Sequence, residues 1–594
     1  MSRKLLVLGI DAFDPRVIDY LWDSLPNFQG LDVYRRLETT IPPETPVAWS
    51  AASSGCNPGK FGIFDFIGRD KKTYRPQLML SEERAGLIKT TFKSMMRGVA
   101  YWDILNTEGI ETTVIRWPVT FPASKIRGRM LSGLGVVDIK GMLNSYRFYT
   151  EVAPAEDSEA REKAIIVDRD DDNRIETYLP GPFVRGISGL RELRIRFSIE
   201  ICDRYVVLSF DKMSQKIRVG EWSDIVRVKY QMGRLLEIYG ICQFYLISIE
   251  PFKMYVSSVQ IDPCHQFVPI TYPVDYGREL AEELGLFYTL GMPEDTKAVN
   301  DNILDKQAFL GQVMEIERQR TKMFYYELNR FKRGVLSFVF DEGDRLQHIF
   351  WENCVLDGSD EFVISEEIRE YYFRKDRLIG DILSYIDRDT SLIIISDHGF
   401  SSFERAVNIN NWLVEEGFMV VRESKTNSLF DFVDWDNTVA YSLGFFSIYI
   451  NQKDRESHGI VSRDDKEDVM REIIQKLSGL RDSGRRVFNN IYAANEIYSG
   501  KYIGESPDII LGFSEGYRMS WKNAVGGLDE EIISVNQYKW KGDHLIDRVY
   551  VPGVIFTNFD IDDRKPSITD IAPTVLDLLN VKIPDWMDGK SLVI

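Results

Sequence analysis

Five residues stand out because their types and spacing suit the binding of metal ions. Asp344 and His348 are four residues apart, and on a helical turn this spacing places both side chains on one face. Asp397 and His398 are adjacent and offer one oxygen and one nitrogen ligand, and His544 adds an imidazole in the sequence Gly-Asp-His. Mixed carboxylate and imidazole ligands suit zinc best, and manganese or iron less well.

Asp11 is a sixth candidate because it follows an apolar run. Three short apolar runs, residues 5–10, 335–340 and 392–396, predict strands that are covered on both faces. Each run is followed closely by one of the acidic candidates. Ligands of open α/β sheets bind beyond the carboxyl ends of the strands, so we expect these loops to converge on one crevice.

The chain has only five histidines. Taken singly, His348, His398 and His544 are each better explained as hydrogen-bonded core or surface residues. Their joint placement in acidic contexts, tied to strand ends, favours a metal site instead. His265 and His458 lack such a context, and we interpret them as ordinary residues.

Thr45 is the candidate nucleophile. Pro46 and the small residues up to Gly55 predict a helix that starts just past Thr45. This start places the hydroxyl group at the positive end of a helix, where a phosphoryl group binds well. A threonine is a weak nucleophile unless a base or a metal activates it, and a metal held by Asp11 and the Asp397-His398 pair would do so. On spacing alone, a helix-capping threonine in a proline-rich turn explains the segment better.

The elements that must position these residues predict an α/β fold. Apolar strands alternate with amphipathic helices, such as the one that spans Phe309 to Leu328 before Gly334. This alternation predicts a mostly parallel central sheet with helices on both faces.

A different pattern occupies the middle of the chain. Leu193, Ile195, Phe197 and Ile199 alternate with polar residues, a period of two that marks half-exposed strands. The charged stretch 155–176 before them predicts an exposed connection. We therefore predict that residues 1–145 form the first part of the core and residues 263–594 the second part. Residues 146–262 are predicted to form a β-rich inserted domain near the mouth of the crevice.

The composition limits the partners of the chain. It has 594 residues, of which 44% are hydrophobic and 28% charged, and a formal net charge of -18. Such an acidic surface repels nucleic-acid phosphates, so we expect a small phosphorylated substrate rather than a nucleic-acid polymer. No stretch reaches the roughly eighteen apolar residues of a membrane span, and we expect no targeting segment. Five scattered cysteines predict reduced thiols in a cytoplasmic protein, and no feature predicts an oligomeric state.

Taken in order, the motifs resemble those of the alkaline phosphatase superfamily. The resemblance is strongest to its type I phosphodiesterase/nucleotide pyrophosphatase branch and to the related predicted phosphohydrolase/phosphomutase group. It covers the chain from end to end apart from the inserted segment. The motifs that carry it are Gly9-Ile-Asp11, Thr45-Pro-Val-Ala-Trp49 with Gly55, Asp344-x-x-x-His348, Ser396-Asp-His-Gly399, Gly542-Asp-His544, Asp570-Ile-Ala-Pro-Thr574 and Asp588-Gly-Lys-Ser591.

The resemblance implies an alkaline-phosphatase-like core with two divalent metal ions, Zn2+ or alternatively Mn2+. It also implies a covalent phospho-enzyme intermediate on Thr45. Two neighbouring ions stabilise both the attacking and the leaving oxygens of an in-line displacement. By position, the first ion would be held by Asp344, His348 and His544, and the second by Asp11, Asp397, His398 and Thr45.

Two nearby segments need separate mention. Relatives often carry His before the Gly of a Pro-x-x-His-Gly segment, whereas this chain has Phe61 before Gly62. That position is not among the metal ligands, so the departure concerns the loop and not the activity. Cys56 opens Cys-Asn-Pro-Gly-Lys, which is similar to the sulfatase signature. The motif ends in Lys60 rather than Arg and Thr45 already fills the nucleophile position, so we reject a sulfatase.

The leading hypothesis is therefore a phosphodiesterase or nucleotide pyrophosphatase that acts on a small diester or pyrophosphate compound. A phosphomonoesterase or phosphomutase would use the same metals, but cofactor-independent mutases use Ser, and Thr45 favours the diesterase branch. A non-catalytic scaffold usually lacks a ligand or the nucleophile, and neither is missing here. Arg116 is a candidate for binding the substrate phosphate, with Trp117 or Trp49 as a face for a base. A solvated Arg and packed tryptophans explain these residues at least as well.

Overall fold

The computed structural model describes residues 4–84, 91–156, 158–186, 189–210, 213–232, 236–351, 363–422 and 431–594. Its central eight-stranded sheet has the order β2-β33-β22-β1-β21-β7-β8-β20. The bounds are β1 Lys4–Ile10, β2 Val33–Leu37, β7 Thr112–Ile115, β8 Gly128–Leu131, β20 Thr271–Tyr272, β21 Gly334–Phe340, β22 Thr390–Ile395 and β33 Gly553–Thr557. The strands from β22 to β8 are parallel, and β33 and β20 pair antiparallel with them. The expected, mostly parallel α/β sheet is confirmed.

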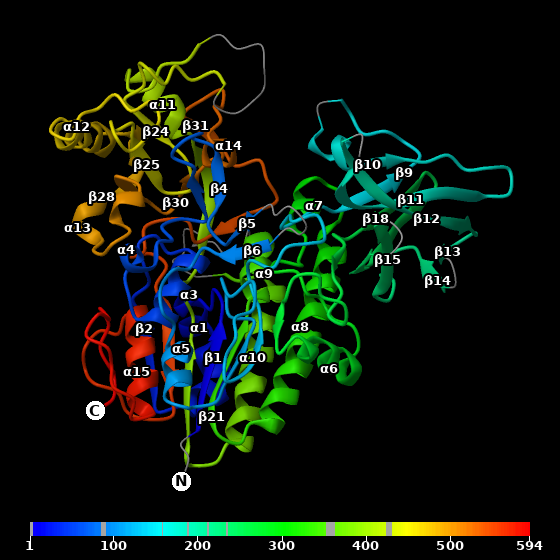
Figure 1. Cartoon of the computed structure of the whole chain (residues 1–594), viewed down its shortest axis with the longest axis horizontal. Helices are drawn as coiled ribbons and strands as arrows, with labels where there is room; N and C mark the ends of the chain where they lie inside the picture. The colour runs from blue at the N-terminus through cyan, green and yellow to red at the C-terminus, as the bar shows by residue number, and fades with distance from the viewer. Residues whose placement is uncertain are drawn as a thin grey trace.

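Helices cover both faces of this sheet. Alternate residues of β1 point to opposite faces, so Leu6 and Leu8 join one hydrophobic cluster and Leu5 and Val7 join another. Figure 1 shows the two helical layers on either side of β1. The first cluster packs against α8 (Lys306–Arg330), α9 (Glu342–Phe350) and α10 (Glu366–Tyr385), and the second against α3 (Thr45–Ser54), α5 (Tyr101–Thr107) and α15 (Ile571–Leu578).

In its described residues, the segment predicted to be β-rich consists of strands and the short helical turn Glu159–Lys163. The strand pairs are antiparallel except β9 with β10, which is parallel. Its apolar faces pack around a hydrophobic cluster of their own. The strands extend to the upper right of Figure 1. They are β9 (Arg147–Thr150), β10 (Ala164–Ile166), β11 (Arg174–Gly186), β12 (Gly189–Ile201), β13 (Tyr205–Phe210), β14 (Met213–Arg218), β15 (Val226–Met232), β16 (Leu236–Cys242), β17 (Phe244–Ile249) and β18 (Phe252–Val256).

Helix α7 (Thr296–Asn300) links the inserted strands to the main body. Lys297 pairs with Glu159 of the insert. Asn300 Oδ1 accepts hydrogen bonds from the backbone N–H groups of Lys539, at 2.9 Å, and of Trp540, at 3.3 Å. The insert therefore contacts, through α7, the loop that leads to the predicted ligand His544.

Residues between about 401 and 546 form a further lobe, which the sequence patterns did not separate from the second part of the core. Short strands and helices of this lobe pack around their own hydrophobic cluster, and the lobe lies at the upper left of Figure 1. Its elements include β23 (Ser401–Val407), α11 (Ile409–Glu415), β24 (Ala440–Ser442), β25 (Ser447–Ile450), α12 (Lys466–Ser478), β28 (Phe488–Ala493), β29 (Ile509–Phe513), β30 (Gly516–Met519) and β32 (Gly542–Asp543). Among the described residues, no helix is both long enough and apolar enough to span a membrane.

Candidate active site

The predicted site residues converge at the carboxyl ends of three neighbouring strands. Asp11 directly follows β1, Asp344 lies in α9 just after β21, and Asp397 comes shortly after β22. Thr45 is brought to the same place at the first turn of α3. Among the described residues, three groups have ligand atoms within 4.8 Å of one another, namely Asp344 with His398 and His544, His348 with Asp543 and His544, and Asp11 with Asp397 and His398.

On one side of the site, Asp344 lies between two imidazoles. Its Oδ1 is 3.2 Å from His348 Nε2 and 3.6 Å from His544 Nε2. Asp344 and His348 share one face of α9 because they are four residues apart. The three side chains predicted to hold the first ion are therefore in contact.

On the other side, His398 is the centre. Its Nε2 lies 3.2 Å from Asp397 Oδ2 and 3.8 Å from Asp11 Oδ1. Thr45 Oγ1 is 3.2 Å from the same nitrogen. The His398 and His544 rings stack with their centroids 3.7 Å apart, so the two sides of the site adjoin.

Thr45 is the first residue of α3, so the helix begins one residue earlier than the sequence predicted. Glu44 occupies the N-cap position of α3 in an extended conformation without a side-chain capping bond, and Pro46 lies in the first turn. Because the first N–H groups of a helix have no partner within it, the Thr45 hydroxyl lies at the end of α3 that attracts anions.

The carboxylate oxygens that face the imidazoles lack hydrogen-bond donors. Asp11 Oδ1, Asp397 Oδ2 and Asp344 Oδ1 are buried without a hydrogen-bond partner, whereas Asp344 Oδ2 is ion-paired with Arg345. The remaining oxygens are satisfied, because Asp11 Oδ2 accepts from Trp49 Nε1 at 3.0 Å and Asp397 Oδ1 accepts from the Ala12 N–H at 3.2 Å. Buried polar atoms nearly always have partners, so these oxygens mark positions for cations.

The three imidazoles are oriented to match. In His348, His398 and His544 the Nδ1–H group donates to a backbone carbonyl, at 2.8, 3.0 and 2.8 Å respectively. This bond fixes the proton on Nδ1 and leaves the Nε2 lone pair free toward the carboxylates. Such a second hydrogen bond is usual for metal-binding histidines.

The pKa values of these side chains also indicate that the site needs positive charge. Burial raises the pKa of Asp11 to about 7, and burial together with the charge of Asp11 raises that of Asp397 well above its ordinary value. Burial lowers the pKa of His348 to about 3 and those of His398 and His544 well below the usual range. Neutral imidazoles beside carboxylates that lack counter-charges fit divalent cations.

Sequence reasoning missed Asp543 and Arg345. Asp543 has a carboxylate oxygen within 4.8 Å of ring nitrogens of His348 and His544. Arg345 is ion-paired with Asp344, and its side chain is 11% exposed. Both residues adjoin a predicted ligand in the sequence, and that adjacency is the only signal that points to them.

Arg116 is buried, and its guanidinium group is occupied by protein partners. It donates to the carbonyl oxygens of Leu290, at 3.0 Å, and Gly291, at 3.1 Å, and pairs with Asp341 at 3.0 Å. Its role in substrate binding stays a prediction. Trp117 is fully buried and donates to the Trp49 carbonyl, and Trp49 is equally buried, so neither ring presents an exposed face.

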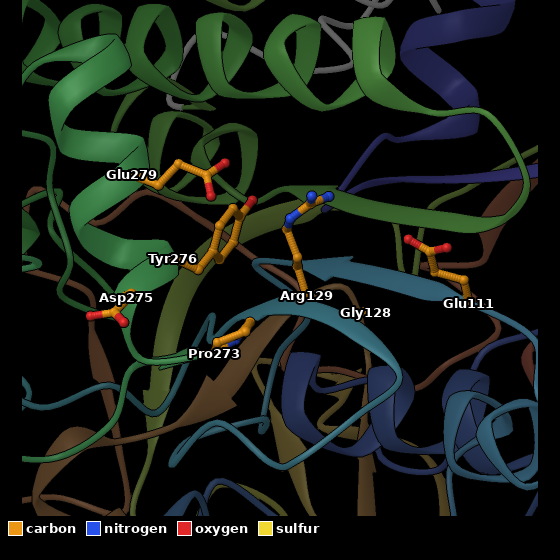
Figure 2. A pocket seen from close by; sticks show the side chains of 7 residues that line it. All are labelled: Glu111, Gly128, Arg129, Pro273, Asp275, Tyr276 and Glu279. Carbon is orange, nitrogen blue, oxygen red and sulfur yellow. The ribbon is translucent and has the colours of Figure 1, made fainter.

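A hollow of about 360 Å³ lies at the opposite end of the central sheet. Figure 2 shows the side chains of Arg129, Tyr276 and Glu279 around it. It adjoins Gly128, the first residue of β8, and is therefore at the amino ends of the strands. None of the three ligand groups found among the described residues lines it.

Comparison with known proteins adds a family match. A family model described as type I phosphodiesterase / nucleotide pyrophosphatase matches residues 5–198 and 278–546, and the gap covers β13 to β20. The solved structure of murine ectonucleotide pyrophosphatase / phosphodiesterase 5 has a TM-score of 0.42 and 10% sequence identity, covering 98% of this chain and 96% of that chain. An inactive form of the murine protein in complex with AMP has a TM-score of 0.43 and 10% sequence identity, covering 98% of this chain and 96% of that chain. The human protein has a TM-score of 0.41 and 10% sequence identity, covering 99% of this chain and 97% of that chain. No curated protein matches the chain.

Proposed function

Because the chain belongs to the type I phosphodiesterase / nucleotide pyrophosphatase family, we propose that it is a metal-dependent hydrolase that uses Thr45 as its nucleophile. Its substrate in this proposal is a small phosphodiester or pyrophosphate compound. One observation carries the proposal, namely the buried carboxylate oxygens without donors that face three Nε2 atoms beside the Thr45 hydroxyl.

Two ions have candidate ligands in this arrangement. One divalent ion would be held by Asp344, His348 and His544, and a second by Asp11, Asp397, His398 and Thr45. When bound, such ions supply the positive charge that stabilises the attacking and leaving oxygens of a displacement. The mixed oxygen and nitrogen donor set suits zinc, with manganese as the alternative.

The protein's own groups account for the rest of the chemistry. Thr45 Oγ1 forms a bond to phosphorus as its proton passes to water, and the bond from phosphorus to the leaving oxygen breaks. Water then attacks the phosphothreonine, the bond between phosphorus and Oγ1 breaks, and a phosphomonoester leaves with the Thr45 hydroxyl restored. The start of α3 and the Arg345 guanidinium group offer N–H donors to the phosphoryl oxygens.

A substrate panel tests the proposal. We expect the metal-loaded protein to cleave an aryl phosphodiester with a kcat/KM more than about tenfold above that for the matching monoester, a preference of roughly 1.4 kcal/mol. A smaller preference would overturn the diesterase assignment in favour of a monoesterase. Phosphate migration within a phosphorylated sugar, without release, would identify a mutase.

A further inference from the structure

Asp543 differs from the other carboxylates of the site because both of its oxygens have partners. Its Oδ1 accepts from the backbone N–H groups of His544, at 2.9 Å, and Leu545, at 3.1 Å. Its Oδ2 accepts from Trp540 Nε1 at 2.7 Å and lies 3.0 Å from Arg518 Nε as an ion pair. Asp344, in contrast, accepts no hydrogen bond at Oδ1, and its Oδ2 has only the ion pair with Arg345. A carboxylate surrounded by N–H groups would have to give up some of these contacts to bind a metal ion.

The partners of Asp543 lead directly to both imidazoles of the Asp344 side. Trp540 stacks on His348 with ring centroids 3.5 Å apart and an angle of 29° between the rings. The same tryptophan is held by its N–H bond to Asp543. Asp543 also fixes the backbone at His544. One carboxylate therefore controls the ring that covers His348 and the chain segment that carries His544.

Arg518 supplies a positive charge beside the Asp543 carboxylate. It is fully buried, and three aromatic rings surround its guanidinium carbon. The ring centroids of Trp521, Phe403 and Phe445 lie 4.1, 4.7 and 5.0 Å from that carbon. None of its nitrogen atoms has a hydrogen-bond partner in the described part of the chain, where its polar contact is the ion pair with Asp543. A buried guanidinium group with a single ionic partner is costly, which ties its presence to that partner.

The backbone anchors this arrangement in the 401–546 lobe. Strand β23 pairs with β30 at Ala406 and Arg518, and with β32 at Ser401 and Asp543. Both charges are thus fixed on neighbours of one strand, whose residues Phe403 and Val407 are buried. The lobe therefore supplies two charged side chains, Arg518 and Asp543, next to the candidate site.

We propose that Arg518, Asp543 and Trp540 are positioning residues for His348 and His544, and that Asp543 is not itself a metal ligand. The inference rests on the proposed function, because it assumes that these two imidazoles bind an ion. The predicted ligand sets contain none of these three residues, and the inference assigns each of them a role.

The alternative, that Asp543 is a ligand, predicts the opposite result for one substitution. Arg518→Met would free Asp543 from its ion pair and leave more negative charge for a metal ion, so zinc binding would stay the same or tighten. If Asp543 positions the imidazoles, the same substitution loosens Trp540 and the His544 segment, and zinc binding weakens. Trp540→Phe keeps an aromatic ring on His348 but removes the N–H donor, and it leaves the buried ion pair intact.

The test measures zinc affinity of the full chain by competition with a chromophoric chelator, together with thermal unfolding. We expect Arg518→Met and Trp540→Phe each to weaken one of two zinc equilibria by about tenfold or more, the size typical of residues behind metal ligands. Arg518→Met combined with Asp543→Asn should weaken zinc binding by less than the product of the two single effects, because the residues act as one unit.

A matched control is Arg69→Met, which removes another buried arginine from its ion pair with Glu456 at 2.7 Å. It should lower the thermal midpoint and leave both zinc equilibria unchanged, and this separates positioning from general destabilisation. If Arg518→Met does not fold, Trp540→Phe decides the matter alone. Unchanged or tighter zinc binding in the folded variants would overturn this inference while leaving the proposed function intact. A wild-type protein that binds no divalent ion would overturn both.

Discussion

Two buried clusters of charged residues in this protein have opposite hydrogen-bonding patterns. In the 401–546 lobe, Asp508 pairs with Arg455 and with Lys466, both at 2.6 Å, and accepts the Ile450 N–H at 2.7 Å. At the candidate site, the carboxylates of Asp11 and Asp397 each keep a buried oxygen without a donor. Burial of an acid therefore does not mark a functional site. The missing donor does, because a purely structural carboxylate is stable only with its partners.

The pKa values separate the two clusters in the same way. Burial raises the pKa of Asp508, but Arg455 and Lys466 outweigh it, and the pKa lies below its ordinary value. At Asp11, burial raises the pKa to about 7, and the charge of Arg345 offsets only part of this effect. One cluster is complete in the protein alone, and the other requires added positive charge.

The largest expected effect tests whether the site needs its nucleophile as well as its ligands. Thr45→Ala removes the attacking oxygen and leaves every carboxylate and imidazole in place. We expect turnover to fall by at least about a thousandfold, while metal content and thermal midpoint stay near the wild-type values. Steady-state kinetics and metal analysis measure both. Near-normal turnover would exclude Thr45 as the nucleophile.

Asp397→Asn tests the oxygen that lacks a donor. Metal content should fall, and activity with it by more than about a hundredfold, because a ligand is lost. In the metal-free protein the same change should raise the thermal midpoint by about 2 °C, since it removes one of two buried carboxylates that repel each other. Calorimetry of chelated samples measures this gain. A lower midpoint would mean that Asp397 is structural.

Arg345→Gln tests the cation that touches the site. We expect a rise of about tenfold in the inhibition constant of inorganic phosphate, because a charged donor to the phosphoryl oxygens is lost. Metal content should not change. Arg369→Gln, which removes a more exposed arginine on α10, is the matched control. Equal phosphate inhibition in the two variants would remove Arg345 from substrate binding.

Glu456→Gln tests the complete cluster. Its side chain is fully buried between Arg69 and Arg455, so the substitution leaves two buried guanidinium groups with less counter-charge. We expect a loss of about 3 kcal/mol in the free energy of unfolding. The kcat/KM of the folded variant should stay within about threefold of wild type, as chemical denaturation and kinetics together can establish. A large loss of activity without loss of stability would contradict the separation of the two clusters.

The smallest effect concerns pH. The pKa of Asp11 is raised from 3.8 to about 7 in the folded protein, so its contribution to stability is fully present below about pH 4 and is lost progressively as the pH rises to about 7. Asp508 has a lowered pKa, so its contribution is present above about pH 4 and is lost on acidification. The metal-free protein should thus be most stable at about pH 4, and bound zinc should abolish the decline between about pH 4 and 7. Thermal midpoints with and without chelator check this.

The convergence of the candidate residues could be predicted from the sequence more readily than the separate core of the 401–546 lobe. Asp11 and Asp397 were found because parallel strands end at one edge of a sheet, so position along the chain translates directly into position in space. Thr45 was found because a proline and small residues predict where a helix begins. These are local rules, and local rules can be read from one sequence.

The parts that escaped prediction depend on contacts between distant segments. Arg518 reads as an ordinary strand residue, and only its burial against Asp543 and three aromatic rings gives it a role. The 401–546 lobe has short strands without a clear period, so its separate core is set by long-range packing. Asp543 was passed over because its neighbour His544 already explained the motif.

The order of strands in the central sheet has a consequence for how the chain is made. Strand β33, residues Gly553–Thr557, lies between β2 and β22, and within the described residues β33 is the strand with which β2 pairs. A ribosome must therefore translate nearly the whole message before β2 finds its place and the edge of β22 is covered. Until then the nascent chain carries an open edge, which invites pairing with other chains. Premature termination before β33 would yield a polypeptide that contains every proposed metal ligand but cannot complete its sheet. Such a polypeptide would be a target for chaperones and proteases.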